Sequence, residues 1–358
     1  MCKKILLVGG GTGGHAFPLL NFVFYIRSRE SKEQGTRYKE VDFHWIGEKN
    51  SIEEKLCEKN SIQFSPIICG KLRRYFSLKT LFLPFQVIIG TLQSLKILFI
   101  ESPIWIFSKG GYVSIPVALA GWMLRIPIYM HESDSRAGLA NRIVAHFARW
   151  IFCSFEEAKT TLPEKKILGY GTLFPPEIGQ VLSCEVWVVS QETQVLVSCG
   201  SQGSASIFET LLHLLETRNS QLKTLKFHVV LWTQNTDFRD KFLAFPNVSL
   251  YDFFYDQKEY FRLVKKCDIA LARSGSSIFE FEAFGLHMIM IPHPHTGNNH
   301  QYWNAKAFES KGHDLLPQSE MKEKLLPLLE KYKNFKKEPK KWVVDMSIFD
   351  IIAQTLFK

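Results

Sequence analysis

The chain has 358 residues, of which 46% are apolar and 22% are charged, and its formal net charge is +9. This length and composition are typical of a globular protein with two domains and exclude a disordered or fibrous chain. The positive charge favours acidic partners such as phosphorylated substrates or an anionic membrane surface. No helix-turn-helix, RRM or zinc-module pattern occurs, so nucleic acid is not an expected partner.

The seven cysteines are scattered, odd in number and without a C-x-x-C pair. This usage indicates a reducing compartment and argues against both a disulfide framework and a zinc site. The apolar run after Lys4 is too short for a signal peptide, so we expect a cytoplasmic location.

Strand-like and helix-like segments alternate in the first half of the chain, which predicts a parallel sheet with helices on both faces. The expected strands are Ile5–Val8, Val41–Ile46, Ile62–Ile68, Ile104–Phe107, Ile126–Met130 and Trp150–Cys153.

A glycine-rich run, Gly9–His15, joins the first expected strand to a helix. Backbone N–H groups at a helix N-terminus are unpaired, and glycine lets an anion or a substrate approach them closely. Gly9, Gly11 and Gly14 match the dinucleotide pattern G-x-G-x-x-G, which alone is weak, and Glu48 is a late candidate for the acidic residue of such a site. His15 adds a titratable side chain beside the turn.

Glycine and proline residues between Leu168 and Pro176 suggest a domain boundary, after which the strand–glycine turn–helix pattern restarts. Two such domains would place both turns at the carboxyl edges of their sheets, where α/β folds bind ligands. The expected strands of the second half are Gln194–Cys199, Phe227–Trp232, Val248–Tyr251, Ile269–Ala272 and Met288–Ile291, and its glycine turn is Gly200–Ser204.

The segment Leu81–Ile100 has about the length of a membrane span but contains Pro84, Gln86, Gly90, Gln93 and Lys96. We expect a core or interfacial helix. Basic and large apolar residues alternate in the adjoining stretch Lys71–Leu83, as in proteins that rest on anionic lipid. An ordinary buried helix with a solvated basic flank is the alternative.

Polar residues gather in the second half, after the strand Ile269–Ala272 and around His293–Gln301. Small hydroxylated residues at a helix start suit a diphosphate, and Glu280, about one turn later, could accept ribose hydroxyls. Three histidines in the second stretch have no acidic partners, so we expect no metal site there. No D-x-D pair occurs, so a sugar-nucleotide enzyme would stabilise its leaving group with helix dipoles and N–H groups.

Six motifs in order resemble the MurG family, UDP-N-acetylglucosamine transferases that convert lipid I to lipid II in peptidoglycan synthesis. They cover most of the chain from residue 5 to about residue 305. The motifs are Gly10–His15 with Phe17 and Pro18; Gly110–Ser114 with Pro116; His131 and Glu132 with Ala137–Leu139 and Asn141; Gly200–Gly203; Arg273–Gly275; and His300, Gln301, Asn304 and Ala305.

This resemblance implies the α/β GT-B fold, two Rossmann-like, doubly wound parallel-sheet domains facing each other across a cleft. We expect an acceptor and membrane-facing domain over residues 1–165, a UDP-GlcNAc-binding domain over 166–339, and a terminal helix, about 340–358, that packs back on the first domain. The implied reaction inverts the anomeric carbon, uses neither metal nor cofactor, and occurs at the cytoplasmic face of the cell membrane. Cell-wall synthesis proteins are further candidate partners.

The family's residue roles transfer where positions match. His15 is the candidate base that removes the proton of the acceptor's 4-hydroxyl, with positioning of that hydroxyl as the alternative. On the acceptor side, Tyr112 and Glu132 would shape the site, although Tyr112 could also be a rigid turn residue. The implied substrate-binding residues are Thr12, Gly13, Gly14, Asp134, Ser201 (diphosphate), Phe254 (uracil), Ser276, Ser277, Glu280 (ribose), Gln301 (GlcNAc hydroxyls) and Asn304, which could instead only pack its helix.

The chain departs from the family pattern at four places. Asp134 stands where asparagine is usual, and Cys199 where glycine is usual. The stretch Leu173–Pro175 lacks the family's arginine. The chain is also one residue short between Gly275 and Gly285, which leaves the roles of Ser276, Ser277 and Ile278 open. These changes bear on donor affinity and sugar identity. The alternatives are a related GT-B transferase with another acceptor or sugar, and a non-catalytic nucleotide-sugar-binding homologue.

Overall fold

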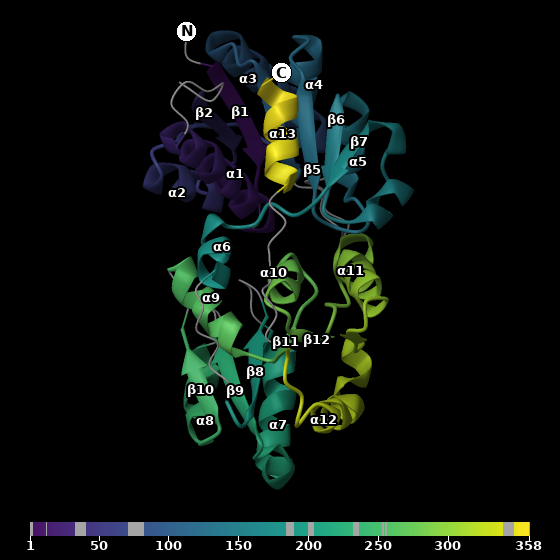
Figure 1. Ribbon diagram of the computed structural model, residues 1–358. Coiled ribbons are helices and arrows are strands. Elements are labelled where there is room, and N and C mark those ends of the chain that lie inside the picture. The colour runs from purple at the N-terminus through teal and green to yellow at the C-terminus, as the bar shows by residue number, and fades with distance from the viewer. Residues whose placement is uncertain are drawn as a thin grey trace. The chain divides into compact units, whose positions relative to one another are not determined.

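The computed structural model describes residues 3–11, 13–32, 41–70, 82–183, 190–199, 204–231, 236–252, 254, 256–338 and 347–357. The chain forms two compact units, Met1–Phe174 with Asp345–Lys358, and Pro175–Val344 (Figure 1). Each unit has its own parallel sheet and hydrophobic core. The α/β class with two Rossmann-like domains is therefore confirmed.

The first unit is built on a seven-stranded parallel sheet in the order β3-β2-β1-β4-β5-β6-β7. The last strand, β7, was not predicted, and it places residues 167–170 in the first unit's sheet. The third strand is shorter than its prediction, and the others lie where apolar runs indicated them. The strands are β1 (Lys3–Gly9), β2 (Val41–Gly47), β3 (Gln63–Pro66), β4 (Trp105–Gly110), β5 (Ile128–Glu132), β6 (Trp150–Cys153) and β7 (Ile167–Tyr170).

Helices cover both faces of this sheet. Side chains from α1 and α13 pack on one face, and side chains from α3, α4 and α5 pack on the other. The terminal helix α13 is also tied to α1, since Asp350 accepts a hydrogen bond from Tyr25 and pairs with Arg29 at 2.9 Å. The helices are α1 (Gly13–Lys32), α2 (Ile52–Lys59), α3 (Leu83–Glu101), α4 (Ser114–Met123), α5 (Leu139–Phe147) and α13 (Ser347–Phe357), with 3-10 turns η2 (Glu156–Thr160) and η3 (Glu164–Lys166).

The second unit repeats the plan with a six-stranded parallel sheet in the order β10-β9-β8-β11-β12-β13. The short strand β13 was not predicted. Its strands are β8 (Thr193–Ser198), β9 (Leu225–Val230), β10 (Val248–Tyr251), β11 (Ile269–Ala272), β12 (His287–Met290) and β13 (Asp314–Leu315). Its helices are α6 (Pro176–Ser183), α7 (Ala205–Leu222), α8 (Arg239–Leu243), α9 (Gln257–Lys266), α10 (Ser277–Ala283), α11 (His300–Glu309) and α12 (Met321–Lys331), with η4 (Thr236–Phe238), η5 (Gly297–Asn299) and η6 (Gln318–Glu320).

The strand order reverses between β1 and β4 in the first sheet and between β8 and β11 in the second. Open α/β sheets bind ligands at the carboxyl ends of such strands, because the connecting helices leave there in opposite directions. The glycine turn after β1, the turn after β4 and the turn after β11 all occupy these positions.

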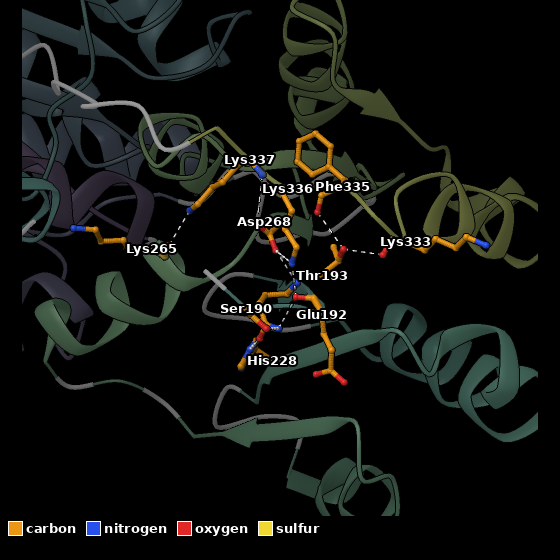
Figure 2. Close-up of polar contacts among 11 residues, drawn as sticks. Ser190, Glu192, Thr193, His228, Lys265, Asp268, Lys333, Phe335, Lys336 and Lys337 are labelled. Carbon is orange, nitrogen blue, oxygen red and sulfur yellow. Dashed lines mark hydrogen bonds and ion pairs between the residues drawn. The ribbon is translucent and has the colours of Figure 1, made fainter. Parts of the chain in front are cut away.

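Residues 333–338 lie against the amino-terminal ends of the strands of the second sheet. Asp268, just before β11, accepts a hydrogen bond from the Gln194 backbone at 2.9 Å. It also pairs with Lys336 at 3.3 Å (Figure 2). Thr193 donates to the carbonyl of Lys333 at 2.8 Å (Figure 2). The segment after α12 is therefore held against the amino ends of β8 and β11.

We expect Asp268→Ala to lower the free energy of unfolding of the second unit by about 2 kcal/mol, because it leaves several partly buried donors without an acceptor. Urea denaturation measures this loss. Asp240→Ala, which removes an exposed carboxylate from α8, is the control and should cost less than about 0.5 kcal/mol. Equal losses in the two variants would contradict the anchoring role of Asp268.

Candidate active site

The glycine turn after β1 is shaped by a buried carboxylate from α2. Glu53 accepts hydrogen bonds from the backbone N–H of Gly11 at 3.4 Å and of Glu48 at 3.2 Å. A Cβ on Gly10 would lie 2.0 Å from Glu53 Oε1, and Gly11 has φ +84°. A side chain at residue 10 would therefore displace the Glu53 carboxylate, and the backbone of residue 11 favours glycine. Sequence analysis missed Glu53, because its role depends on how α2 packs against the turn.

The first turn of α1 carries three of the predicted site residues. Gly14 is exposed, and Gly13 and His15 are partly exposed, so the imidazole can be reached from solvent. The first backbone N–H groups of this 20-residue helix, which have no partner within the helix, lie in the same turn. Thr12 lies outside the described residues.

A second glycine turn, after β4, packs directly on the first. A Cβ on Gly111 would lie 2.5 Å from the carbonyl oxygen of Gly10, and one on Gly11 would lie 2.8 Å from the Tyr112 ring. Tyr112 donates its hydroxyl to Glu48. Burial and this carboxylate raise the pKa of Tyr112, so the phenol stays protonated. Tyr112 thus braces both turns, and its contact with an acceptor stays a prediction.

Glu132, at the end of β5, is a buried carboxylate with two donors. It accepts hydrogen bonds from the Asp134 backbone N–H at 2.9 Å and from the Asn141 side chain at 2.8 Å. Burial raises the pKa of Glu132, and the charge of Asp134 adds to this, whereas Lys109 opposes it. Asp134, which stands where asparagine is usual in the family, therefore places a second carboxylate near that of Glu132.

His131 has a structural environment. Its Nε2 donates to the carbonyl of Gly171 at 2.9 Å, and the side chain is buried. Burial and the nearby Lys109 hold the pKa of His131 well below its ordinary value. The ring is therefore neutral and ties β5 to the turn after β7.

Arg273, directly after β11, organises the corresponding edge of the second sheet. Its guanidinium is buried and donates to Ser204 Oγ at 2.6 Å, Gln318 Oε1 at 2.8 Å and the Ile291 carbonyl at 3.0 Å. Ser204 stands immediately before α7, so Arg273 fixes the start of that helix. Ser201 and the rest of the second glycine turn lie outside the described residues. Arg273 was noted only as part of a motif; a charged residue directly after a buried apolar strand is the signal for it.

The helix α10 carries the predicted ribose residue. Ser276 and Ser277 form its start, and Glu280 follows in the first turn. Burial raises the pKa of Glu280 to about 8. Among the described residues, no hydrogen bond from the Ser276 side chain caps the helix.

Residues of α11 are tied to the turn after β11. The Ser274 hydroxyl donates to the Gln301 carbonyl at 2.8 Å, and the Asn304 side chain donates to the Ser274 carbonyl at 3.2 Å. Asn304 is buried, which supports the packing role left open for it. The Gln301 side chain accepts from the backbone N–H of His293 at 2.8 Å, so its amide nitrogen is the remaining donor.

Phe254 belongs to an aromatic group beside β10. Its ring stacks on Tyr251 with centroids 5.7 Å apart and contacts Tyr260 at 5.6 Å. The Tyr260 hydroxyl and Ser198, at the end of β8, lie 3.2 Å apart. This packing holds the backbone at residue 254 near the carboxyl edge of the sheet.

The three histidines of the 293–300 loop serve the loop itself. His293 Nδ1 accepts from the His295 backbone at 3.2 Å, and His300 Nδ1 lies 2.9 Å from the Gly297 carbonyl. Within the described ranges, no three His, Cys, Asp or Glu side chains converge in a way that could hold a metal ion.

The described site residues thus fall into two sets, one in each unit. Gly13, Gly14, His15, Tyr112, Glu132 and Asp134 lie at the carboxyl edge of the first sheet; Phe254, Ser276, Ser277, Glu280, Gln301 and Asn304 lie at that of the second.

Comparison with known proteins agrees with this arrangement. The glycosyltransferase family 28 N-terminal domain matches residues 5–153, and the family 28 C-terminal domain matches residues 194–346. A Bacillus cereus protein is 33% identical over 87% of this chain and 85% of its own length, and a Clostridium botulinum protein is 32% identical over 90% and 89%. Both are named as UDP-N-acetylglucosamine–N-acetylmuramyl-(pentapeptide) pyrophosphoryl-undecaprenol N-acetylglucosamine transferases.

Solved structures show the same fold. The crystal structure of Acinetobacter baumannii MurG superposes with a TM-score of 0.71 at 20% identity, covering 98% of this chain and 99% of that one. A Neisseria meningitidis UDP-GlcNAc 2-epimerase bound to UDP-GlcNAc gives 0.64 at 15% identity and covers 99% of both chains. With both family domains matched and relatives similar over nearly their whole length, the chain is a member of glycosyltransferase family 28, of the MurG type with two Rossmann-like domains.

Proposed function

We propose that this enzyme transfers N-acetylglucosamine from UDP-GlcNAc to the muramyl 4-hydroxyl of undecaprenyl-pyrophosphoryl-MurNAc-pentapeptide, lipid I, to form lipid II. The observation that carries the proposal is the similarity, over 85–90% of both lengths, to relatives named for this reaction. The two sets of site residues, one at the carboxyl edge of each sheet, support the proposal, because a transfer between two substrates needs a binding site for each.

The first unit takes the acceptor. His15 lies on the first turn of α1 and is partly exposed, and a neutral imidazole is a suitable base near pH 7. It removes the proton from the 4-hydroxyl as the oxygen attacks the anomeric carbon from the face opposite UDP, so the configuration inverts. Tyr112 and Glu132 support the walls of this acceptor site.

The second unit takes the donor. Glu280 accepts the ribose hydroxyls, the backbone near Phe254 contacts the uracil, and Gln301 binds the sugar. Ser276, Ser277 and Asn304 complete the surroundings of α10 and α11. The leaving diphosphate is stabilised by the glycine turn that contains Ser201 and by the N-terminus of α7, which Arg273 holds in place. No divalent ion is needed for that charge.

The helix α3 places the enzyme on the membrane surface, where the acceptor's lipid chain stays in the bilayer. It is long and apolar enough to cross a membrane, and only 17% of its apolar window is buried. Its inner side nonetheless packs tightly: a Cβ on Gly90 would lie 2.2 Å from the Ile68 carbonyl oxygen. A helix packed along one side on its own domain fits an in-plane membrane contact better than a span. The basic stretch from Lys71 to Leu81 lies outside the described residues.

Its outward face, together with the end of α4, is broadly apolar, which is the composition that an interfacial surface requires. The exposed apolar residues are Phe82, Phe85, Ile88, Ile89, Leu92, Phe99, Ile100, Trp122 and Met123.

The first test is transfer of labelled GlcNAc from UDP-GlcNAc to a short-chain lipid I analogue, with EDTA present. Turnover is expected, and His15→Ala should lower kcat by roughly 10²–10⁴ if His15 is the base. His146→Ala, an exposed histidine of α5, is the matched control and should leave kcat unchanged. A loss below tenfold in His15→Ala would rule out proton transfer by His15, and donor binding without turnover would point to another acceptor.

Donor binding should depend on pH through Glu280. Its pKa of about 8 means that the carboxyl is protonated near pH 6.5, so UDP-GlcNAc affinity should rise by about tenfold towards pH 8.5 as the carboxylate forms. Calorimetric titration at several pH values measures this. Glu280→Gln should bind more weakly with a flat profile, whereas Glu282→Gln, on the same helix, should keep the wild-type slope. The same slope in Glu280→Gln would refute the ribose role.

Membrane contact is tested with one apolar residue from each unit. Leu92 on α3 and Leu243 on α8 are both 60% exposed. Leu92→Glu should weaken co-sedimentation with anionic phospholipid vesicles by at least about tenfold, since it removes apolar area from the lipid and adds a repelled charge. Leu243→Glu should have no effect. Similar binding of the two variants would exclude α3 as the contact.

A further inference from the structure

The start of α11 is held by a neighbouring turn rather than by a cap of its own. Asn298 and Asn299, just before the helix, have φ values of +52° and +51°, in the left-handed region. Within the described part of the chain, the Asn299 side chain makes no capping hydrogen bond to the helix. A helix start without a side-chain cap is less firmly fixed than a capped one. Contacts from outside the helix therefore decide where its first turn lies.

Two of these contacts come from residue 274, in the turn after β11. The Ser274 hydroxyl donates to the carbonyl of Gln301 at 2.8 Å, and the Asn304 side chain donates to the carbonyl of Ser274 at 3.2 Å. Ser274 is 0% exposed and Asn304 is 1% exposed, so water does not compete for these hydrogen bonds. Removing a partner would leave a buried polar group unpaired. The turn after β11 thus holds the first turn of α11 at two points.

The turn that carries Ser274 is itself held in place by the residue before it. Arg273 donates to Ser204 Oγ at 2.6 Å and to the carbonyl of Ile291, after β12, at 3.0 Å. The helix α10 begins at Ser277, three residues after Ser274, and carries Glu280 in its first turn. Ser274 therefore connects α11 to a turn that is already fixed relative to α10.

The side chain of Gln301 has one fixed orientation. Its Oε1 accepts a hydrogen bond from the backbone N–H of His293 at 2.8 Å. A backbone N–H can only donate, so the opposite orientation of the amide would place Nε2 against it, with two donors facing each other. Nε2 is therefore fixed as a donor. Its position depends on the backbone of Gln301, which the Ser274 hydroxyl holds.

We propose that Ser274 is a positioning residue for the sugar of the donor: its hydroxyl holds Gln301 so that Nε2 donates to a hydroxyl oxygen of N-acetylglucosamine. The Ser274 hydroxyl bonds to α11, whereas the residues proposed for the nucleotide are Glu280 on α10 and Phe254 beside β10. Its loss should therefore affect binding of the sugar more than binding of the nucleotide. The inference deepens the proposed function and rests on it in one respect, that Gln301 binds the sugar.

Calorimetric titration with UDP-GlcNAc and with UDP separates the two effects and needs no acceptor. Ser274→Ala should weaken UDP-GlcNAc binding by about fivefold and leave UDP binding within about twofold, because UDP lacks the sugar. Gln301→Ala should show the same split. In the double variant, Ser274→Ala should add less than about a twofold loss to that of Gln301→Ala, because Ser274 acts through Gln301.

Thr193→Val is the matched control. It removes another buried hydroxyl of the second unit that donates to a backbone carbonyl, but at the amino end of the same sheet. Both affinities should stay unchanged in this variant, because the amino end of the sheet lies away from the proposed donor site.

Equal losses of UDP and UDP-GlcNAc affinity in Ser274→Ala would indicate a general structural role and overturn the proposal. An unchanged UDP-GlcNAc affinity, or additive losses in the double variant, would also overturn it. A wild type that binds no UDP-GlcNAc would refute both this proposal and the proposed donor. A wild type that binds UDP-GlcNAc without transfer to lipid I would refute the proposed acceptor alone, and the binding series would still decide the role of Ser274.

Discussion

The close approach of two backbone turns controls the shape of the first unit's site. Side chains are excluded where Gly111 meets the carbonyl of Gly10 and where Gly10 meets Glu53. Gly111 also has φ +85°, a backbone conformation that favours glycine. Because the turn leads straight into α1, the same contacts set the position of His15. If His15 is the base that we propose, its placement depends on the turn before it.

The buried charge of Arg273, at the carboxyl edge of the second sheet, is surrounded by neutral oxygens. The oxygens of Ser204, Gln318 and the Ile291 carbonyl each accept one of its N–H groups, and its Nε has no partner among the described residues. Neutral acceptors leave the guanidinium charge available to attract an anion nearby. This arrangement suits the diphosphate that we propose for this edge.

The helix α3 illustrates why hydropathy alone does not separate a span from a surface helix. Gly90, Ser94 and Leu98 form a buried strip that packs on the domain, and the remaining sides are apolar and exposed. We expected a core or interfacial helix, and the small buried share of α3 argues against a core helix, whereas its contact with a membrane stays a proposal. The sequence could not separate the two, because both require apolar residues and differ only in what covers them.

The sequence by itself was enough to predict the order of strands and helices, the glycine turns and the family. These features depend on local patterns of apolar runs, small residues and motifs. The sequence also predicted His15 and Glu280 by their place at helix starts, and Glu132 through the family resemblance, and their roles stay predictions. Only the tertiary structure showed that Glu53 and Arg273 hold the turns at the two sheet edges, and that Asn304 packs against Ser274. Their partners lie in other strands and helices, and which segments become neighbours is decided by sheet order and helix packing rather than by local sequence.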